Sequence, residues 1–343
     1  MKHLLNTLYV MTEDAYLSLE GETVLVNQND KVIGKFPLHN LCNIVSFSYA
    51  GASPALMGAC ANRNIGLSFF SRNGRFLARA MGMTTGNVLL RKEQYRISDD
   101  EAKSCLIART MVYGKIYNAR WRLERTKRDH SMRVDIDKIQ LAIDALKEHG
   151  LSALEATDLD VLRGIEGKAA EQYFSVFDEM ILRDKEHFYL HERNRRPPLD
   201  NVNAMLSFAY TILAGECSNA LEGVGLDAYV GFLHRDRPGR KSLGLDLMEE
   251  LRACMADRFV LKLINNRIVQ ADDFVCTESG AVLMTENARK QFIKEWQEMK
   301  KETIVHPYTE EKIPWGLVPH LQSLLLARYL RGDLDEYPPL LWK

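Results

Sequence analysis

The chain has 343 residues, more than one compact core usually contains, so we expect two domains. Its composition is ordinary for a globular protein, with 46% hydrophobic and 27% charged residues. The net charge of −1 excludes a protein that binds nucleic acid through an overall positive charge, so any basic surface must be local.

Residues 1 to about 83 predict short β-strands, because they form brief runs rich in β-branched and aromatic residues between turn sequences such as Glu20-Gly21. The tight spacing favours an antiparallel meander. Residues 53–64 are the exception, since their small and apolar residues have helical spacing. A last hairpin is expected from "IGLSFF" and "RFLARA", which Asn73-Gly74 separates.

From about residue 87 the periodicity becomes helical. Ser98 and Glu101 have the spacing of a capping box and predict the start of a long helix. Further helices are expected at 136–149, 166–182, 201–216, 243–268, 286–301 and 319–331, with a small hairpin at 274–285. The predicted fold class is therefore α+β, with a small N-terminal antiparallel β domain at 1–86 and a larger all-α domain at 87–343.

Cysteine usage and apolar runs indicate a cytoplasmic protein. The six cysteines form no Cys-x-x-Cys pair, which argues against structural zinc and suits a reducing compartment. Asn6 and Thr7 interrupt "MKHLLNTLYVM", so its apolar part is too short for a signal peptide. No apolar run approaches the ~20 residues of a membrane helix.

Two segments are locally basic. Residues 109–133 hold eight Arg or Lys against only Glu124 and Asp129. Such a run is most often a solvated helix face. It becomes a track for phosphates if it lies on the same side as the second segment, residues 235–241, which also carries several cations.

Glu166 lies on the apolar face of its predicted helix. The positions that share this face are Ala169, Ala170, Tyr173, Phe174 and Phe177. A lone buried carboxylate is costly unless it is paired or bound to a metal. The alternative is that Glu166 occupies the first turn, half exposed, and interacts with the helix dipole.

Three more residues suggest a metal site. Asp246 and Glu249 are one helical turn apart, on one edge of an apolar stripe, and His234 ends the apolar run before the basic segment. Each alone has an ordinary interpretation: a solvated helix edge for the acids and a hydrogen-bonded core residue for His234. Together with Glu166, they are a set of hard oxygen ligands with one imidazole, which is typical of Mg²⁺ or Mn²⁺.

Several enzyme classes lack support. The sequence has no G-x-S-x-G, no P-loop and no G-x-G-x-x-G, so a serine hydrolase, a P-loop NTPase and a dinucleotide-binding enzyme are not indicated.

The segments "LRGIEGKAAEQYF", "NRRPPLDNVNAMLSFAYTIL", "GLDAYVGFLH" and "SLGLDLMEELR", in this order, resemble the CRISPR-associated endonuclease and integrase family Cas1. "GASPALMGACANRNIGLSFF" and "GNVLLRKEQYR" resemble the β domain of that family and its junction with the helical domain. The resemblance covers nearly the whole chain. The C-terminal "IPWGLVPHLQSLLLARYL" and "YPPLLWK" are similar to the branch found in type I-C systems.

The resemblance implies a function and site residues. The family cuts and joins DNA, inserting short foreign segments (spacers) beside the leader of a repeat array. Its metal ligands fall here on Glu166, His234 and Glu249, and Asp246 matches a further acid near the site. Mg²⁺ or Mn²⁺ is the expected cofactor. For DNA binding we expect contacts with phosphates from Lys168, Arg235, Arg237, Arg240 and Lys241.

The resemblance also implies partners: a homodimer paired through the β domains, the small protein Cas2, and double-stranded DNA from the spacer precursor and the repeat array. No membrane partner is expected. Two other functions stay open. A general metal-dependent nuclease acting on DNA or RNA would use the same residues, and a non-catalytic nucleic-acid scaffold would leave the acids a structural role.

Overall fold

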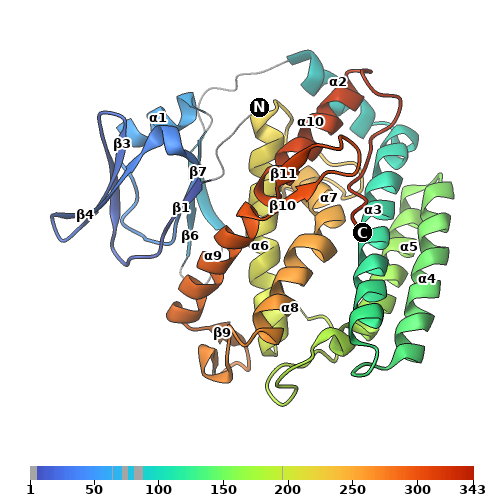
Figure 1. Cartoon of the computed structure of the whole chain (residues 1–343). Coiled ribbons are helices and arrows are strands. Elements are labelled where there is room, and N and C mark those ends of the chain that lie inside the picture. The colour runs from blue at the N-terminus through green and yellow to red at the C-terminus, as the bar shows by residue number, and fades with distance from the viewer. Residues whose placement is uncertain (1–5, 64, 72–75, 81–87, 195) are drawn as a thin grey trace. The chain divides into compact units, whose positions relative to one another are not determined.

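A computed structural model of the chain describes residues 6–63, 65–71, 76–80, 88–194 and 196–343 (Figure 1). The chain divides into two compact units. One contains residues up to 86 together with Arg289–Glu302, and the other contains residues 87–288 and Thr303–Lys343. The units therefore differ from the predicted domains in the segment Arg289–Glu302. The predicted turn at Asn73-Gly74 lies outside the described residues.

The first unit contains two β-sheets and helix α1. Its elements are β1 (Asn6–Val10), β2 (Tyr16–Glu20), β3 (Thr23–Gln28), β4 (Lys31–Pro37), β5 (Leu41–Ser46), α1 (Pro54–Asn62), β6 (Gly66–Phe70) and β7 (Phe76–Ala80). The strands β2, β3 and β4 form an antiparallel sheet, as predicted. The predicted hairpin of β6 and β7 and the predicted helix α1 are also confirmed.

The second sheet, in the order β1-β5-β6-β7, corrects the prediction of a purely antiparallel domain. Strand β5 pairs in parallel with both β1 and β6. The reason is the connections: the whole β2–β4 sheet separates β1 from β5, and α1 separates β5 from β6. Connections of this length return the chain to the same end of the sheet, which produces parallel neighbours.

The second unit is mostly helical, as predicted. Its helices are α2 (Val88–Ser98), α3 (Glu101–His130), α4 (Ile136–Glu155), α5 (Leu159–Ser175), α6 (Asn201–Gly223), α7 (Ser242–Leu251), α8 (Arg258–Asn265) and α10 (Val318–Leu330). Its short strands are β8 (Phe274–Cys276), β9 (Val282–Met284), β10 (Thr303–Val305) and β11 (Lys312–Pro314). Helix α9 (Glu286–Lys301) begins in this unit and continues in the first. The hairpin of β8 and β9 was predicted, whereas the hairpin of β10 and β11 was not.

Helix α3 organises the second unit, because it packs against α4, α5 and α7 (Figure 1). Its N-cap is Asp100, whose carboxylate accepts a hydrogen bond from the backbone N–H of Lys103 at 3.1 Å. The predicted cap at Ser98 is therefore wrong. Ser98 ends α2, and its hydroxyl donates to the carbonyl of Tyr95.

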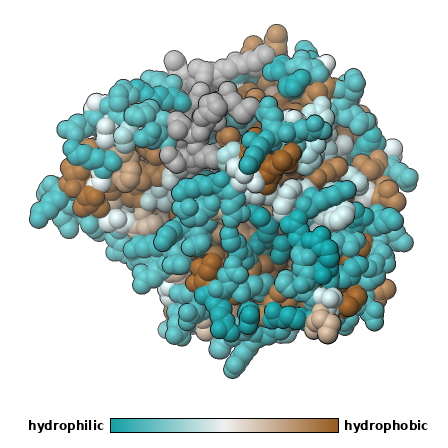
Figure 2. Space-filling view, viewed as in Figure 1, coloured by the Kyte–Doolittle hydropathy of each residue, from teal (hydrophilic) through white to brown (hydrophobic). Residues whose placement is uncertain are grey.

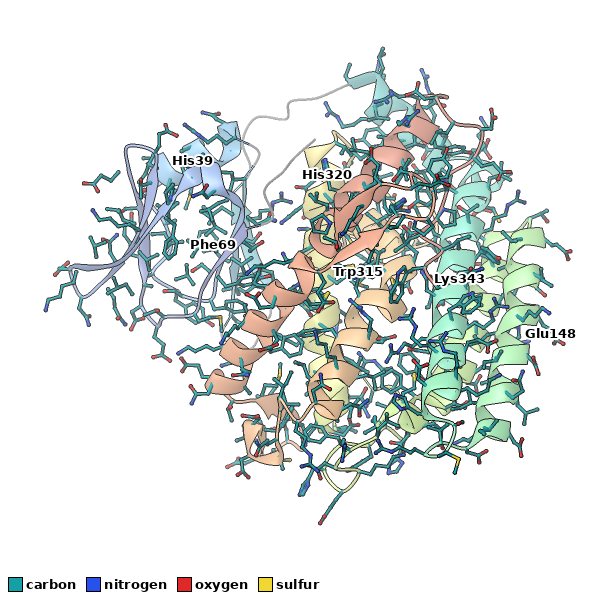
Figure 3. The ribbon with its side chains drawn as sticks, in the orientation of Figure 1. His39, Phe69, Glu148, Trp315, His320 and Lys343 are labelled. Carbon is teal, nitrogen blue, oxygen red and sulfur yellow. The ribbon has the colours of Figure 1, made fainter. Side chains whose placement is uncertain are left out.

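The C-terminal segment connects α3 with α7. The side-chain amide of Asn118 donates to the carbonyls of Glu250 at 2.7 Å and Leu340 at 2.8 Å, and its oxygen accepts from the backbone N–H of Trp342 at 2.9 Å. The buried carboxylate of Glu250 accepts from Tyr337 at 2.6 Å. Figure 3 shows Lys343, the last residue, beside α3. These contacts fix the position of α7, the helix that carries Asp246 and Glu249.

Hydrophilic residues cover most of the face drawn in Figure 2, and the hydrophobic residues on it form small groups. Within the described part of the chain, no helix combines the length and the apolar character that crossing a membrane requires.

We predict that Asn118→Ala lowers the free energy of unfolding by about 2–3 kcal/mol, because it leaves buried backbone groups of Glu250, Leu340 and Trp342 without their partner. Urea titration followed by tryptophan fluorescence measures the change. Arg96→Ala, which removes an exposed ion pair, is the control and should cost less than about 0.5 kcal/mol. Equal effects of the two substitutions would contradict the proposed role of Asn118.

Candidate active site

Two helices and one loop of the second unit carry the predicted site residues. Glu166 projects from the middle of α5, Asp246 and Glu249 from α7, and His234 from the loop before α7. Helix α5 begins at Leu159, so the alternative in which Glu166 occupies a first turn is wrong. The segment in which His234 lies is a loop and not a strand.

Asp246 fixes the loop that carries His234. It is fully buried, and its carboxylate accepts hydrogen bonds from three successive backbone N–H groups, those of Phe232 at 2.7 Å, Leu233 at 3.0 Å and His234 at 3.0 Å. The same carboxylate contacts Nδ1 of His234 at 2.6 Å. An Nδ1–H that donates to a carboxylate leaves Nε2 with its lone pair, as a ligand for a metal.

Gly231 makes this close approach of loop and helix possible. A Cβ atom at this position would lie 2.8 Å from Cβ of Ser242 and 2.9 Å from Oδ2 of Asp246. Any larger residue would therefore push the loop away from α7 and break its hydrogen bonds with Asp246. The glycine in "GFLH" is explained by this contact.

Glu166 and Glu249 share one lysine. Nζ of Lys115, on α3, forms an ion pair with Glu166 and lies 2.8 Å from Oε2 of Glu249. The side chain of Glu249 is only 3% exposed and that of Glu166 is 26% exposed. The prediction that Glu166 lies on a largely buried face is confirmed, and the solvated edge considered for Asp246 and Glu249 is excluded.

Arg252 completes the surroundings of Glu249, since its guanidinium lies 2.8 Å from Oε1. Burial by itself raises the pKa of Glu249, but the positive charges of Arg252 and Lys115 outweigh burial and lower it below the ordinary value. The carboxyl group is therefore ionised at neutral pH and available to a cation.

A buried aromatic ring supports Arg252. The guanidinium lies 4.8 Å from the ring centre of Tyr210, on α6, and the hydroxyl of Tyr210 donates to Asp257 at 2.5 Å. Arg252 and Asp257 are the first and last residues of a π-helical segment, Arg252–Asp257, which interrupts the continuous helix predicted for 243–268. In a π-helix the hydrogen bonds join residues five apart, so this segment allows both residues to reach Tyr210.

The basic loop before α7 is partly held by one acid of α5. Arg235 contacts both carboxylate oxygens of Asp160, at 2.8 and 2.9 Å. Arg237 is exposed, and Gly239 adopts a φ of +76° in the turn that follows. Lys241 occupies the N-cap position of α7 without a side-chain cap, and Ser242 is the first residue of the helix.

The other predicted DNA contacts are divided between exposed and half-buried positions. Lys168 is exposed on α5, two residues after Glu166, and Arg240 is half-buried.

The interpretation of 109–133 as a solvated face or a phosphate track needs correction, because Lys115 is buried among the site residues.

The donor set suits a hard divalent cation, with two carboxylates and an imidazole that has a free Nε2. In addition, Oε2 of Glu249 is buried and lacks a directed hydrogen bond, although Lys115 lies within ion-pair distance. Among the described residues, however, no three His, Cys, Asp or Glu side chains are already arranged to hold a metal. Lys115 lies between the two carboxylates, and Glu166, His234 and Glu249 are the residues that would hold the ion.

Sequence reasoning missed Lys115, Arg252, Tyr210 and Asp257. A signal existed for Lys115, because it is four residues from both Met111 and Ala119, which are buried on α3. The basic composition of the surrounding segment concealed this spacing. No comparable signal marks Arg252, since its position depends on the π-helical segment.

Comparisons with known proteins identify the family of the chain. The family model described as CRISPR associated protein Cas1 matches residues 8–298. The chain belongs to the Cas1 family. It is 48% identical over 343 residues to CRISPR-associated endonuclease Cas1 1 of Chlorobaculum tepidum, and the match covers 100% of both chains. This curated relative of the chain is a CRISPR-associated endonuclease.

Solved Cas1-like structures share the fold. A Cas1 protein from Thermotoga maritima superposes with a TM-score of 0.82 at 23% identity, covering 95% of this chain and 97% of that chain. A casposase bound to integration product superposes with a TM-score of 0.81 at 21% identity, covering 98% of this chain and 94% of that chain.

We predict that Asp257→Asn changes how stability depends on pH. Burial raises the pKa of Asp257 from 3.8 to about 6. The folded state of the wild type therefore holds its proton more tightly than the unfolded state, and stability is lost as pH rises from about 4 to about 6. Asparagine does not titrate, so the variant should gain about 2–3 kcal/mol relative to the wild type between pH 4 and pH 7.5.

Urea titrations of both proteins at several pH values measure this difference. Asp100→Asn is the control: the backbone N–H of Lys103 lowers the pKa of Asp100, so this variant should not gain stability over the wild type as pH rises. If the curves of the wild type and Asp257→Asn are parallel, the pKa of Asp257 is not raised.

Proposed function

We propose that this Cas1-family protein is a divalent-metal-dependent DNA endonuclease and integrase that inserts spacers into a repeat array by transesterification. The observation that supports the proposal is that Glu166 and Glu249 share Lys115 and that Asp246 orients His234. Glu166, His234 and Glu249, from separate segments of one unit, would supply the oxygen and imidazole ligands that suit Mg²⁺ or Mn²⁺.

In the reaction, a 3′-hydroxyl attacks a phosphodiester in line and another 3′-oxygen leaves. Glu166, His234 and Glu249 would hold a divalent ion, which would supply the positive charge that polarises the phosphoryl oxygen and stabilises the alkoxide. Asp246 keeps His234 in one tautomer and one orientation, and Arg252 restrains the carboxylate of Glu249. No covalent protein intermediate is needed, so positioning and charge stabilisation are what the chain supplies.

Lys168, Arg235, Arg237, Arg240 and Lys241 are the proposed phosphate contacts. Arg235 already pairs with Asp160, so its contribution would be shared between the carboxylate and the DNA. Arg237, at the exposed tip of the loop, is the member of the set best placed for backbone phosphates.

The casposase of the same fold is described as bound to integration product, which favours strand transfer over general hydrolysis. A nuclease that uses water in place of the 3′-hydroxyl is the second candidate, since the same residues would serve it. A strand-transfer assay with a short duplex that has free 3′-hydroxyl ends separates the two.

A non-catalytic scaffold is the weaker alternative, because it gives no physical reason for burying the carboxylate of Glu249.

For partners we propose a homodimer formed through the β-rich unit, the small protein Cas2, and double-stranded DNA. Strand β4, at one edge of its sheet, exposes Val32, Ile33 and Phe36, and an edge of this kind can be covered by a second copy. The assignment to the type I-C branch stays a prediction.

We predict that Glu166→Ala, His234→Ala and Glu249→Ala each lower the rate of strand transfer by about 100-fold or more, because each removes a ligand. Affinity for duplex DNA should stay within about threefold, since phosphate contacts dominate binding. His187→Ala, at an exposed histidine paired with Asp184, is the control and should be fully active.

A thermal melt provides a second measurement. Mn²⁺ should raise the melting temperature of the wild type but not of Glu166→Ala. Near wild-type integration by any of the three variants would falsify the ligand assignment.

We predict that replacing Arg237, Arg240 and Lys241 together by Ala weakens DNA binding about equally for different sequences. The slope of log affinity against log salt should become shallower by about one unit per lost phosphate contact. Fluorescence anisotropy with two unrelated duplexes measures both effects. Arg96, Lys138 and Lys185, which pair with acids elsewhere on the helical unit, form the matched control triple variant. An unchanged slope would mean that the loop does not contact the DNA backbone.

A further inference from the structure

Lys115 occupies the position that a bound cation needs. Its ammonium forms an ion pair with Glu166 and lies 2.8 Å from Oε2 of Glu249, two of the three proposed ligands. It comes from the middle of α3, and its side chain is only 11% exposed. Two carboxylates that share one ammonium cannot both bind a divalent ion until the ammonium has moved.

The structure contains a space into which the ammonium can move. A pocket of about 20 Å³ lies beside the site and is lined mostly by apolar atoms. The polar residues at it are Lys115, Tyr173, Tyr210, Arg252 and Asp257. A pocket of this volume holds a group the size of one water molecule, and an ammonium is of similar size. Asp257 supplies a carboxylate at the pocket, and Arg252 is the cation that faces it.

We propose that Lys115 is a built-in counter-cation that holds Glu166 and Glu249 in the metal-free protein and moves into this pocket when a divalent ion binds. Lys115 therefore competes with the metal and sets the ion concentration at which the site is loaded. The inference rests on the proposed function of the site, and concerns a residue that the ligand assignment leaves out.

The competition explains two features of the structure together. It accounts for a pair of carboxylates that are held close without being arranged as a finished metal site. It also accounts for a lysine that is buried on the apolar side of α3, where an uncompensated ammonium would be costly. In the metal-free state the two carboxylates provide this compensation.

The test is the dissociation constant for Mn²⁺ without DNA, measured by calorimetry on the full-length protein. Lys115→Met keeps the length of the side chain but removes the charge, so Mn²⁺ should bind at least about tenfold more tightly. Lys115→Arg keeps the charge, but its guanidinium is too large for the pocket, so Mn²⁺ should bind at least about tenfold more weakly than to the wild type.

The arginine variant separates displacement from simple repulsion. If Lys115 only repelled the metal without moving, lysine and arginine would give equal dissociation constants, and the proposal would be overturned. Unchanged or weaker binding by Lys115→Met would also overturn it. Lys127→Met, on the same helix but paired with Glu124, is the control and should bind Mn²⁺ as the wild type does.

Thermal melts add a readout that does not depend on activity. In EDTA, Lys115→Met should melt below the wild type, because two carboxylates lose their partner, and Mn²⁺ should raise its melting temperature more than that of the wild type. If Lys115→Met does not fold, Lys115→Gln replaces it, since it is also neutral and must change Mn²⁺ affinity in the same direction.

The two proposals fail differently. If the wild type binds Mn²⁺ no more tightly than Glu166→Ala does, the assignment of the metal site is wrong. If the wild type binds Mn²⁺ and Lys115→Met binds it no better, the ligands are right and only the role of Lys115 is wrong.

Discussion

The carboxylate of Glu249 is almost completely buried, and a buried charge is stable only when opposite charges and hydrogen bonds compensate for the loss of water. Lys115 from α3 and Arg252 from the π-helical segment provide this compensation. Their positions in turn require α3 and α7 to be held side by side, as Asn118 and the C-terminal segment hold them. The packing of α3 against α7 thus supplies the charges that stabilise one ionised carboxylate in the interior of the helical unit.

The same principle organises the second half of the site. Asp246 is also buried, but backbone N–H groups rather than cations compensate its charge. This difference gives the two acids of α7 different roles. Asp246 has its acceptor positions filled and acts by orienting His234, whereas Glu249 keeps an oxygen without a directed hydrogen bond and can bind a cation. Two acids one turn apart are therefore not interchangeable.

A site whose charges already balance must exchange one cation for another when it binds metal. Lys115 is the natural cation to exchange, because its long side chain can move while Arg252 is restrained by the ring of Tyr210. Such an exchange links the metal-binding step to the stability of the protein. It also means that the metal-free arrangement need not resemble a finished coordination sphere, even where the ligands are correct.

The sequence by itself predicted the strand-rich first part and the helical second part, and it named Glu166, His234, Asp246 and Glu249 as candidate site residues. Helical spacing and residue chemistry are local properties, so they can be read along the chain. Only the tertiary structure decided that β5 has parallel neighbours, that Asp246 contacts Nδ1 of His234, and that Lys115 lies between the acids. These features are contacts between segments distant in the chain, and Lys115 and Glu166 are 51 positions apart. Periodicity shows which face of a helix is buried, but the partner that meets this face is chosen by packing.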